Sequence, residues 1–278
     1  MKAVKYSDAR VNAFGPRGDA GIKTLIEGRA EDADNFAVYL QRMDEKFFTP
    51  RHRHNFDQYR VVLENRLNIG PNFDLDPGEM AYFPEGAHYG PQHGSSPSAV
   101  LLTLHVAGAS RSGYINLEEL TAGLGALKER GSIQNGVYTE FDASGKKRNK
   151  DSYEAVWEHL RGRELKYPRP RYPAPIKIQP DDFSWISWSA GVRTKHLGSF
   201  TECHGGWYLF ELDKDARGTF GMQNHRCVIV VKDGSLVHAG MRYEKFSSFL
   251  VERGENCELQ AQADGAMLIQ FVLPDFRQ

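Results

Sequence analysis

Cysteine is scarce in this chain of 278 residues: it has three, Cys203, Cys227 and Cys257, and no two lie close together. Zinc knuckles and redox motifs are built from close cysteine pairs, so this spacing argues against both, and we expect buried, reduced thiols. A Gly-x-Ser-x-Gly element, a cysteine among histidines and a glycine-rich phosphate loop are also missing. The nucleophiles of hydrolases and the fingerprints of nucleotide-binding proteins are therefore not predicted.

An excess of charge of one sign is missing as well. The 35 Lys and Arg residues offset 36 Asp and Glu residues, which leaves a formal net charge of −1. This balance predicts no attraction to nucleic acid or to an anionic membrane, so a small molecule is the expected partner. No apolar run reaches the length of a membrane span, and residues 1–5 lack the apolar core of a secretory signal. We expect a cytoplasmic globular protein.

Two histidines stand at strand spacing in segment 52–58, whose sequence is HRHNFDQ. Side chains two residues apart share one face of a β-strand, so His52, His54 and Gln58 would project to the same side. Asp57 would project to the opposite side. The segment therefore predicts that three nitrogen and oxygen donors converge on one metal.

A second element follows at 78–88, GEMAYFPEGAH, in which Pro-x-Gly predicts a turn. The turn would bring His88 from a neighbouring strand toward the same point. Together the two elements resemble the motifs of the cupin superfamily, which are His-x-His followed by a carboxylate, then glycine, five residues, Pro-x-Gly and a histidine. Gln58 stands where the carboxylate is usual, and one residue fewer than usual separates Gly86 from His88.

The resemblance implies a barrel that binds one divalent transition metal (Fe, Mn, Ni, Cu or Zn) through His52, His54, Gln58 and His88. His93 is the alternative fourth ligand if the loop after the turn runs differently. Because these ligands are neutral, the ion would keep its full charge, which favours Lewis-acid chemistry. The implied reaction is dioxygenase-type cleavage, or metal-assisted isomerisation, cyclisation or lyase chemistry. The alternative is a non-catalytic module that binds or senses a small ligand.

An internal repeat runs through the chain. Gly86 and Gly254 both follow an apolar stretch, and they are 168 residues apart, as are the apolar runs that end at Leu63 and Val231. A constant offset through two elements predicts a duplicated domain. At the same offset, the four expected ligands correspond to Phe220, Met222, Arg226 and Asn256. The second copy is therefore expected to bind no metal.

We predict an all-β protein, a bicupin with two double-stranded β-helix (jelly-roll) barrels and a short helical insertion between them. The metal-binding barrel is expected at 1–112, a helical and Pro-rich connector at 113–180 and the second barrel at 181–278. In the connector, Asn116 and Asp151 are each typical of the residue that caps the start of a helix. Cupins commonly pair through barrel edges, so the resemblance also implies a homodimer.

Three further side chains are candidates for a substrate pocket beside the metal. Arg60 shares the strand parity of the ligands and could pair with a substrate carboxylate, or else with Asp57 or Glu64 at the barrel rim. Phe56 and Tyr82 would line the cavity, or belong only to the core.

Overall fold

The structure is a computed structural model that describes residues 1–12, 20–30, 32, 34–200 and 204–276. The chain divides into two compact units. The N-terminal unit comprises 11–23 and 28–178, and the C-terminal unit comprises 1–10, 24–27 and 179–278. The break after residue 178 lies beside the expected boundary at 180, whereas the expected connector at 113–180 lies almost wholly within the N-terminal unit.

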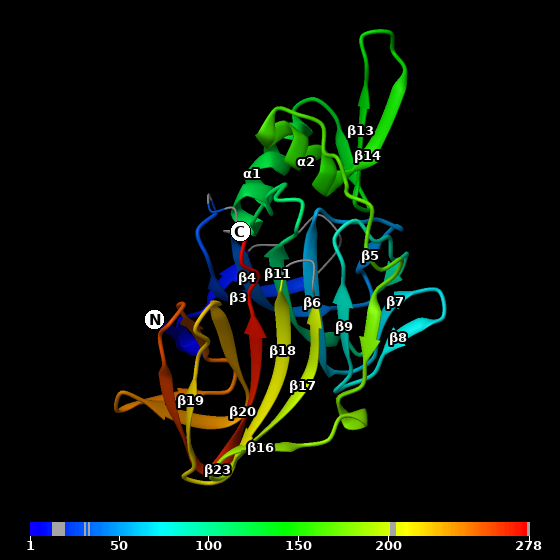
Figure 1. Cartoon of the computed structure of the whole chain (residues 1–278). Coiled ribbons are helices and arrows are strands. Elements are labelled where there is room, and N and C mark those ends of the chain that lie inside the picture. The colour runs from blue at the N-terminus through cyan, green and yellow to red at the C-terminus, as the bar shows by residue number, and fades with distance from the viewer. Residues whose placement is uncertain (13–19, 31, 33, 201–203, 277–278) are drawn as a thin grey trace. The chain divides into compact units, whose positions relative to one another are not determined.

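An antiparallel sheet forms the N-terminal barrel, with strand order β15-β9-β6-β11-β4-β3-β2 (Figure 1). Two short strand pairs, β5 with β10 and β7 with β8, complete it. The strands are β2 (Arg10–Asn12), β3 (Ala20–Glu27), β4 (Phe36–Met43), β5 (Phe48–Thr49), β6 (Phe56–Glu64), β7 (Leu67–Gly70), β8 (Phe73–Leu75), β9 (Met80–Phe83), β10 (Gln92–His93), β11 (Ala99–Ala107) and β15 (Ile176–Ile178).

The C-terminal barrel repeats this order as β1-β22-β20-β23-β18-β17-β16. Strands β22, β20, β23, β18 and β17 take the places of β9, β6, β11, β4 and β3, which confirms the predicted duplication. The elements are β1 (Lys2–Val4), β16 (Ile186–Ser189), β17 (Val192–Phe200), β18 (Gly205–Leu212), β19 (Arg217–Phe220), β20 (Cys227–His238), β21 (Met241–Glu244), β22 (Ser248–Val251) and β23 (Cys257–Val272), with 3-10 turns at Tyr6–Asp8 and Pro180–Asp182.

Apolar side chains fill the C-terminal barrel. Phe220, one of the positions predicted to have lost a metal ligand, is buried in this core together with Phe249 and Leu268. Cys227 and Cys257 are free, buried thiols as expected, and burial raises the pKa of each to about 12. Cys203 lies outside the described residues. The position that corresponds to His52 in the duplication therefore carries a buried apolar side chain.

The helical insertion holds α1 (Leu117–Lys128), α2 (Ser152–Arg161) and an antiparallel sheet of β12 (Ser132–Gln134), β13 (Val137–Phe141) and β14 (Lys147–Asp151) (Figure 1). Asn116 and Glu119 form the predicted capping box, and Asp151 caps α2 by accepting hydrogen bonds from two backbone N–H groups. Trp157 and Val156 of α2 share one core with Phe56 of β6. In the described part of the chain, neither helix has the length and apolar character that crossing a membrane requires.

Two glycines of α1 should respond oppositely to alanine. A Cβ at Gly123 would lie 2.4 Å from Val156 Cγ1 of α2, whereas at Gly125 it would meet nothing within 4 Å. We expect Gly123→Ala to lower the free energy of unfolding by about 1–3 kcal/mol through overpacking. Gly125→Ala should raise it by about 0.5–1 kcal/mol, since glycine is a poor helix former. Urea denaturation of both variants checks this, and a stabilising Gly123→Ala would refute the close packing of α1 on α2.

Candidate binding pocket

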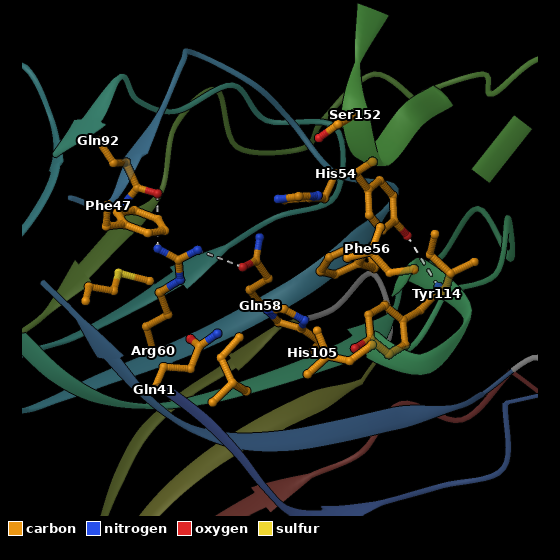
Figure 2. A pocket seen from close by; sticks show the side chains of 16 residues that line it. Gln41, Phe47, His54, Phe56, Gln58, Arg60, Gln92, His105, Tyr114 and Ser152 are labelled. Atoms are coloured by element: carbon orange, nitrogen blue, oxygen red, sulfur yellow. Dashed lines mark hydrogen bonds between the residues drawn. The ribbon is translucent and has the colours of Figure 1, made fainter. Parts of the chain in front are cut away.

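The N-terminal unit has a partly open cavity of about 130 Å³ between the inner face of its sheet and the helical insertion (Figure 2). Arg60, Gln92 and Gln41 lie at one end of the lining together with Phe47, and Phe56 and Tyr114 lie toward the other end (Figure 2). The described lining residues are Ile22, Gln41, Met43, Phe47, His54, Phe56, Gln58, Arg60, Gln92, His105, Tyr114, Ile115, Leu117, Leu120, Ser152 and Tyr153.

Strand β6 contributes Phe56, Gln58 and Arg60 to the pocket, because alternate residues of a strand point to the same face. The intervening Asp57 points away, and its Oδ1 accepts a hydrogen bond from the backbone N–H of Glu85 at 2.7 Å. The predicted alternation is therefore confirmed within β6, whereas residues 53–55, which were expected to belong to the same strand, lie outside it.

Arg60 is the centre of a buried hydrogen-bonded group, which we call the Arg60 cluster: Arg60, Gln58, Tyr89 and Gln92. Nη2 of Arg60 donates both to Gln58 Oε1 at 3.0 Å and to the Tyr89 hydroxyl at 3.2 Å, and Nη1 donates to Gln92 Oε1 at 3.4 Å. Gln58 Nε2 donates to the same Tyr89 hydroxyl at 3.0 Å. The guanidinium carbon also lies 4.5 Å from the centre of the Phe83 ring. These contacts offset the cost of holding a cation that is only 6% exposed.

The two histidines of the first motif lie beside this cluster. Their ring centres are 4.8 Å apart, and His54 stacks on Phe56. Nδ1 of His52 lies 2.8 Å from the Pro50 carbonyl oxygen, to which it donates, and this orients the ring. His52 and His54 therefore lie beside each other. Tyr89 links them to Gln58, because its ring centre is 4.4 Å from that of His52 and its hydroxyl accepts from Gln58 Nε2.

His88 does not join them. It is exposed, and the pocket side of this segment is occupied by Tyr89, which pairs directly with His52 across two backbone hydrogen bonds of 3.0 Å. Residues opposite each other on paired segments share a face, so the neighbouring His88 must point the other way. His93 is exposed too, and Gln92 takes the inward position beside it. In the cupin motif two residues usually separate the glycine of Pro-x-Gly from the histidine. Two residues also separate Gly86 from Tyr89, so this spacing could have identified Tyr89 as the residue that faces the pocket.

Tyr82 belongs to the core, which is the second of the two expected places, and it does not line the pocket. It is fully buried, but in the register of β6 with β9 it lies opposite Tyr59, and its ring packs on those of Tyr59 and Tyr172. Phe83, opposite Gln58, faces the pocket side instead. A shift of one residue in register moves every side chain to the other face, and the sequence does not determine that register.

The nitrogen and oxygen donors in this arrangement do not suit a divalent metal. The two oxygens that could complete a site with His52 and His54 are Gln58 Oε1 and Tyr89 Oη, and both accept hydrogen bonds from Arg60 Nη2. A divalent ion about 4 Å from a guanidinium would be repelled by roughly 8 kcal/mol at an effective dielectric constant of about 20. Among the described residues, no group of three or more His, Cys, Asp or Glu could hold a metal.

The Pro-x-Gly turn that carries Tyr89 contains a buried carboxyl group, Glu85. The backbone N–H of Ser110 donates to Glu85 Oε2 at 3.0 Å, and the Ser110 hydroxyl donates to Oε1. Burial raises the pKa of Glu85 to about 7, and the hydrogen bonds from Ser110 act in the opposite direction. The nearby Asp57 carboxylate adds to the rise.

This pKa makes stability depend on pH. In the unfolded chain Glu85 returns to its ordinary pKa of 4.5, so the folded state holds the proton more tightly. The stabilisation is complete below about pH 4.5 and is lost as the pH rises through about 7, by up to roughly 3 kcal/mol. Urea denaturation from about pH 5 to about pH 8 measures this, and Glu85→Gln should flatten the dependence. The exposed Glu64→Gln is the control, and an equal effect of both changes would contradict the assignment to Glu85.

No protein-family profile matches the sequence, and no curated protein resembles it closely. Solved structures do match. The nickel(II) complex of the bacterial pirin YhhW from Escherichia coli has a TM-score of 0.57 at 11% identity, and the match covers 98% of each chain. A structure concerned with the Mn(II) centres of Bacillus subtilis oxalate decarboxylase has a TM-score of 0.59 at 13% identity and covers 100% of this chain and 78% of that one. GK1651 from Geobacillus kaustophilus, with a TM-score of 0.58 at 11% identity, is covered over 96% of its length.

These likenesses show the fold. The protein has the bicupin fold, with two cupin barrels in one chain. Two of these neighbours are described with a divalent metal, nickel(II) for the pirin and Mn(II) for the oxalate decarboxylase.

Proposed function

We propose that the N-terminal barrel binds a small organic acid, with the carboxylate on the Arg60 guanidinium and the apolar body among the aromatic side chains. The observation that carries the proposal is the buried guanidinium in the lining of a partly open, mainly apolar pocket. A guanidinium matches a carboxylate with two parallel hydrogen bonds, which gives the site both affinity and orientation. The cavity is similar in size to one of roughly 150 Å³ that takes benzene in another protein, so benzoate is a suitable probe.

Calorimetric titration with benzoate and with its neutral isostere benzamide tests this proposal. We expect benzoate to bind at least about 10-fold more tightly than benzamide, since hydrogen bonds to a charged group contribute about 1.5–3 kcal/mol. Equal affinities for the two, or no benzoate binding at millimolar concentration, would sink the proposal.

Turnover of the bound acid is the second candidate, and the imidazoles of His54 and His105 in the same lining favour it. Imidazole can accept or donate a proton near neutral pH, and both rings face the space in which the acid would lie. The dioxygenase, isomerase, cyclase or lyase chemistry expected from the family resemblance stays a prediction. Chromatography of candidate acids after incubation with the protein, with His54→Ala as the control, separates turnover from binding alone.

A further inference from the structure

We propose that the guanidinium of Arg60 occupies the position of the metal, so that this barrel carries a fixed organic cation in place of a divalent ion. Gln58 and Tyr89 stand at the two positions of the cupin motifs that follow the His-x-His pair. Their oxygens, Oε1 and Oη, both accept hydrogen bonds from one atom, Arg60 Nη2, at 3.0 and 3.2 Å. One cationic nitrogen therefore lies between the oxygens that a metal would otherwise share. This inference concerns the site of the proposed function but does not depend on acid binding.

The surroundings of Arg60 suit a guanidinium better than a metal ion. Its acceptors at Gln58, Gln92 and Tyr89 are neutral amide and phenol oxygens, which can satisfy N–H donors arranged in a plane. Phe83 and Tyr89 add ring faces at 4.5 and 5.4 Å from the guanidinium carbon, and a guanidinium stacks on such faces. A hard divalent ion gains nothing comparable from a phenylalanine ring, and it prefers charged oxygen or imidazole ligands.

A guanidinium in place of a metal ion changes the chemistry that the site can perform. A guanidinium keeps its proton throughout the accessible pH range, so the cation cannot be lost by titration. It offers N–H donors instead of open coordination positions, so it binds a carboxylate through hydrogen bonds and does not activate water. The pocket thus retains the electrostatic attraction of a metal site for anions without its Lewis acidity.

Two substitutions should convert this site into a metal site. His52, His54 and Gln58 are in place, Tyr89 stands where the motif has histidine, and Arg60 supplies the competing charge. Replacing Tyr89 by the smaller histidine and removing the guanidinium should therefore create three imidazoles and an amide oxygen around one point. We expect the Tyr89→His, Arg60→Leu double variant to bind one equivalent of Co(II) or Ni(II) at least about 100-fold more tightly than the unaltered protein.

The experiment titrates untagged protein with Co(II), followed by the visible absorption of the bound ion, and with Ni(II), followed by calorimetry. The single variant Tyr89→His, which keeps Arg60, should bind much more weakly than the double variant, and His54→Ala in the double variant should abolish binding. Equal binding by Tyr89→His alone and by the double variant would overturn the proposal, since the guanidinium would then not compete. A folded double variant that takes up no metal would overturn it too.

A measurement on the unaltered protein tests the same proposal and does not depend on whether the double variant folds. We expect it to take up no stoichiometric Co(II) or Ni(II), and one tightly bound equivalent that disappears in His52→Ala would refute the proposal. The two proposals can fail separately. Loss of the benzoate preference with the expected metal results would refute acid binding alone, and stoichiometric metal in a protein that prefers benzoate would refute only the replacement of the metal.

Discussion

Arg60→Leu should weaken benzoate binding by roughly 10- to 150-fold, the equivalent of the 1.5–3 kcal/mol that hydrogen bonds to charged groups contribute. The substitution removes the positive charge and the planar donors that would meet the carboxylate, and it leaves the aromatic end of the pocket intact. Benzamide affinity should change far less, because the neutral probe gains little from the guanidinium. Calorimetric titration of both probes against both proteins measures the expected difference.

Two further variants test whether the loss of affinity is specific to the Arg60 guanidinium. Arg42→Leu is the matched control, because Arg42 lies on β4 between the pocket residues Gln41 and Met43 but is exposed. It should leave the benzoate affinity unchanged. Arg60→Lys should give an intermediate loss, since an ammonium keeps the charge without the planar fork. Equal losses in Arg60→Leu and Arg42→Leu would show that net charge, and not the pocket, governs binding.

Trp157→Ala should lower the free energy of unfolding by about 3–5 kcal/mol, the usual cost of removing a large buried aromatic side chain. Trp157 is fully buried in the core that joins α2 to the barrel, and its Nε1 donates to the Gly113 carbonyl at 3.0 Å. The change would leave a cavity, and the Gly113 carbonyl would keep only the hydrogen bond that it accepts from Asn55 Nδ2 at 2.7 Å. Urea denaturation followed by circular dichroism measures the loss.

The control for this change is Leu160→Ala on the same helix. Leu160 is 37% exposed, so its truncation should cost less than about 1 kcal/mol. Because α2 also supplies Ser152 and Tyr153 to the pocket, Trp157→Ala should weaken benzoate binding as well. If Trp157→Ala were no more destabilising than Leu160→Ala, the insertion could not be packed on the barrel as described.

The helical insertion forms part of the pocket wall. The sequence marks 113–180 as a connector, but its helices supply Leu117, Leu120, Ser152 and Tyr153 to the lining of the cavity. Tyr153 is wholly buried there, and burial raises the pKa of its phenol, so it stays protonated. Part of the cavity wall is therefore made of residues that no cupin motif contains.

Local patterns in the sequence were sufficient to predict much of the fold and part of the candidate site. The duplication followed from a constant offset, the helix starts at Asn116 and Asp151 from capping chemistry, and the shared face of Phe56, Gln58 and Arg60 from strand alternation. Each of these features depends on residues close together in the chain or on repetition, so no knowledge of distant contacts was needed.

The tertiary structure alone decided the identity of the residues that meet across strands. Tyr89 and not His88 faces His52, and Phe83 and not Tyr82 faces the pocket, because register between segments depends on the turn that joins them. The approach of the Arg60 guanidinium to Gln58 and Tyr89 likewise follows from how β6 packs against the segment after the turn. The sequence determined which side chains were available to the site, and long-range packing determined that a guanidinium lies at its centre.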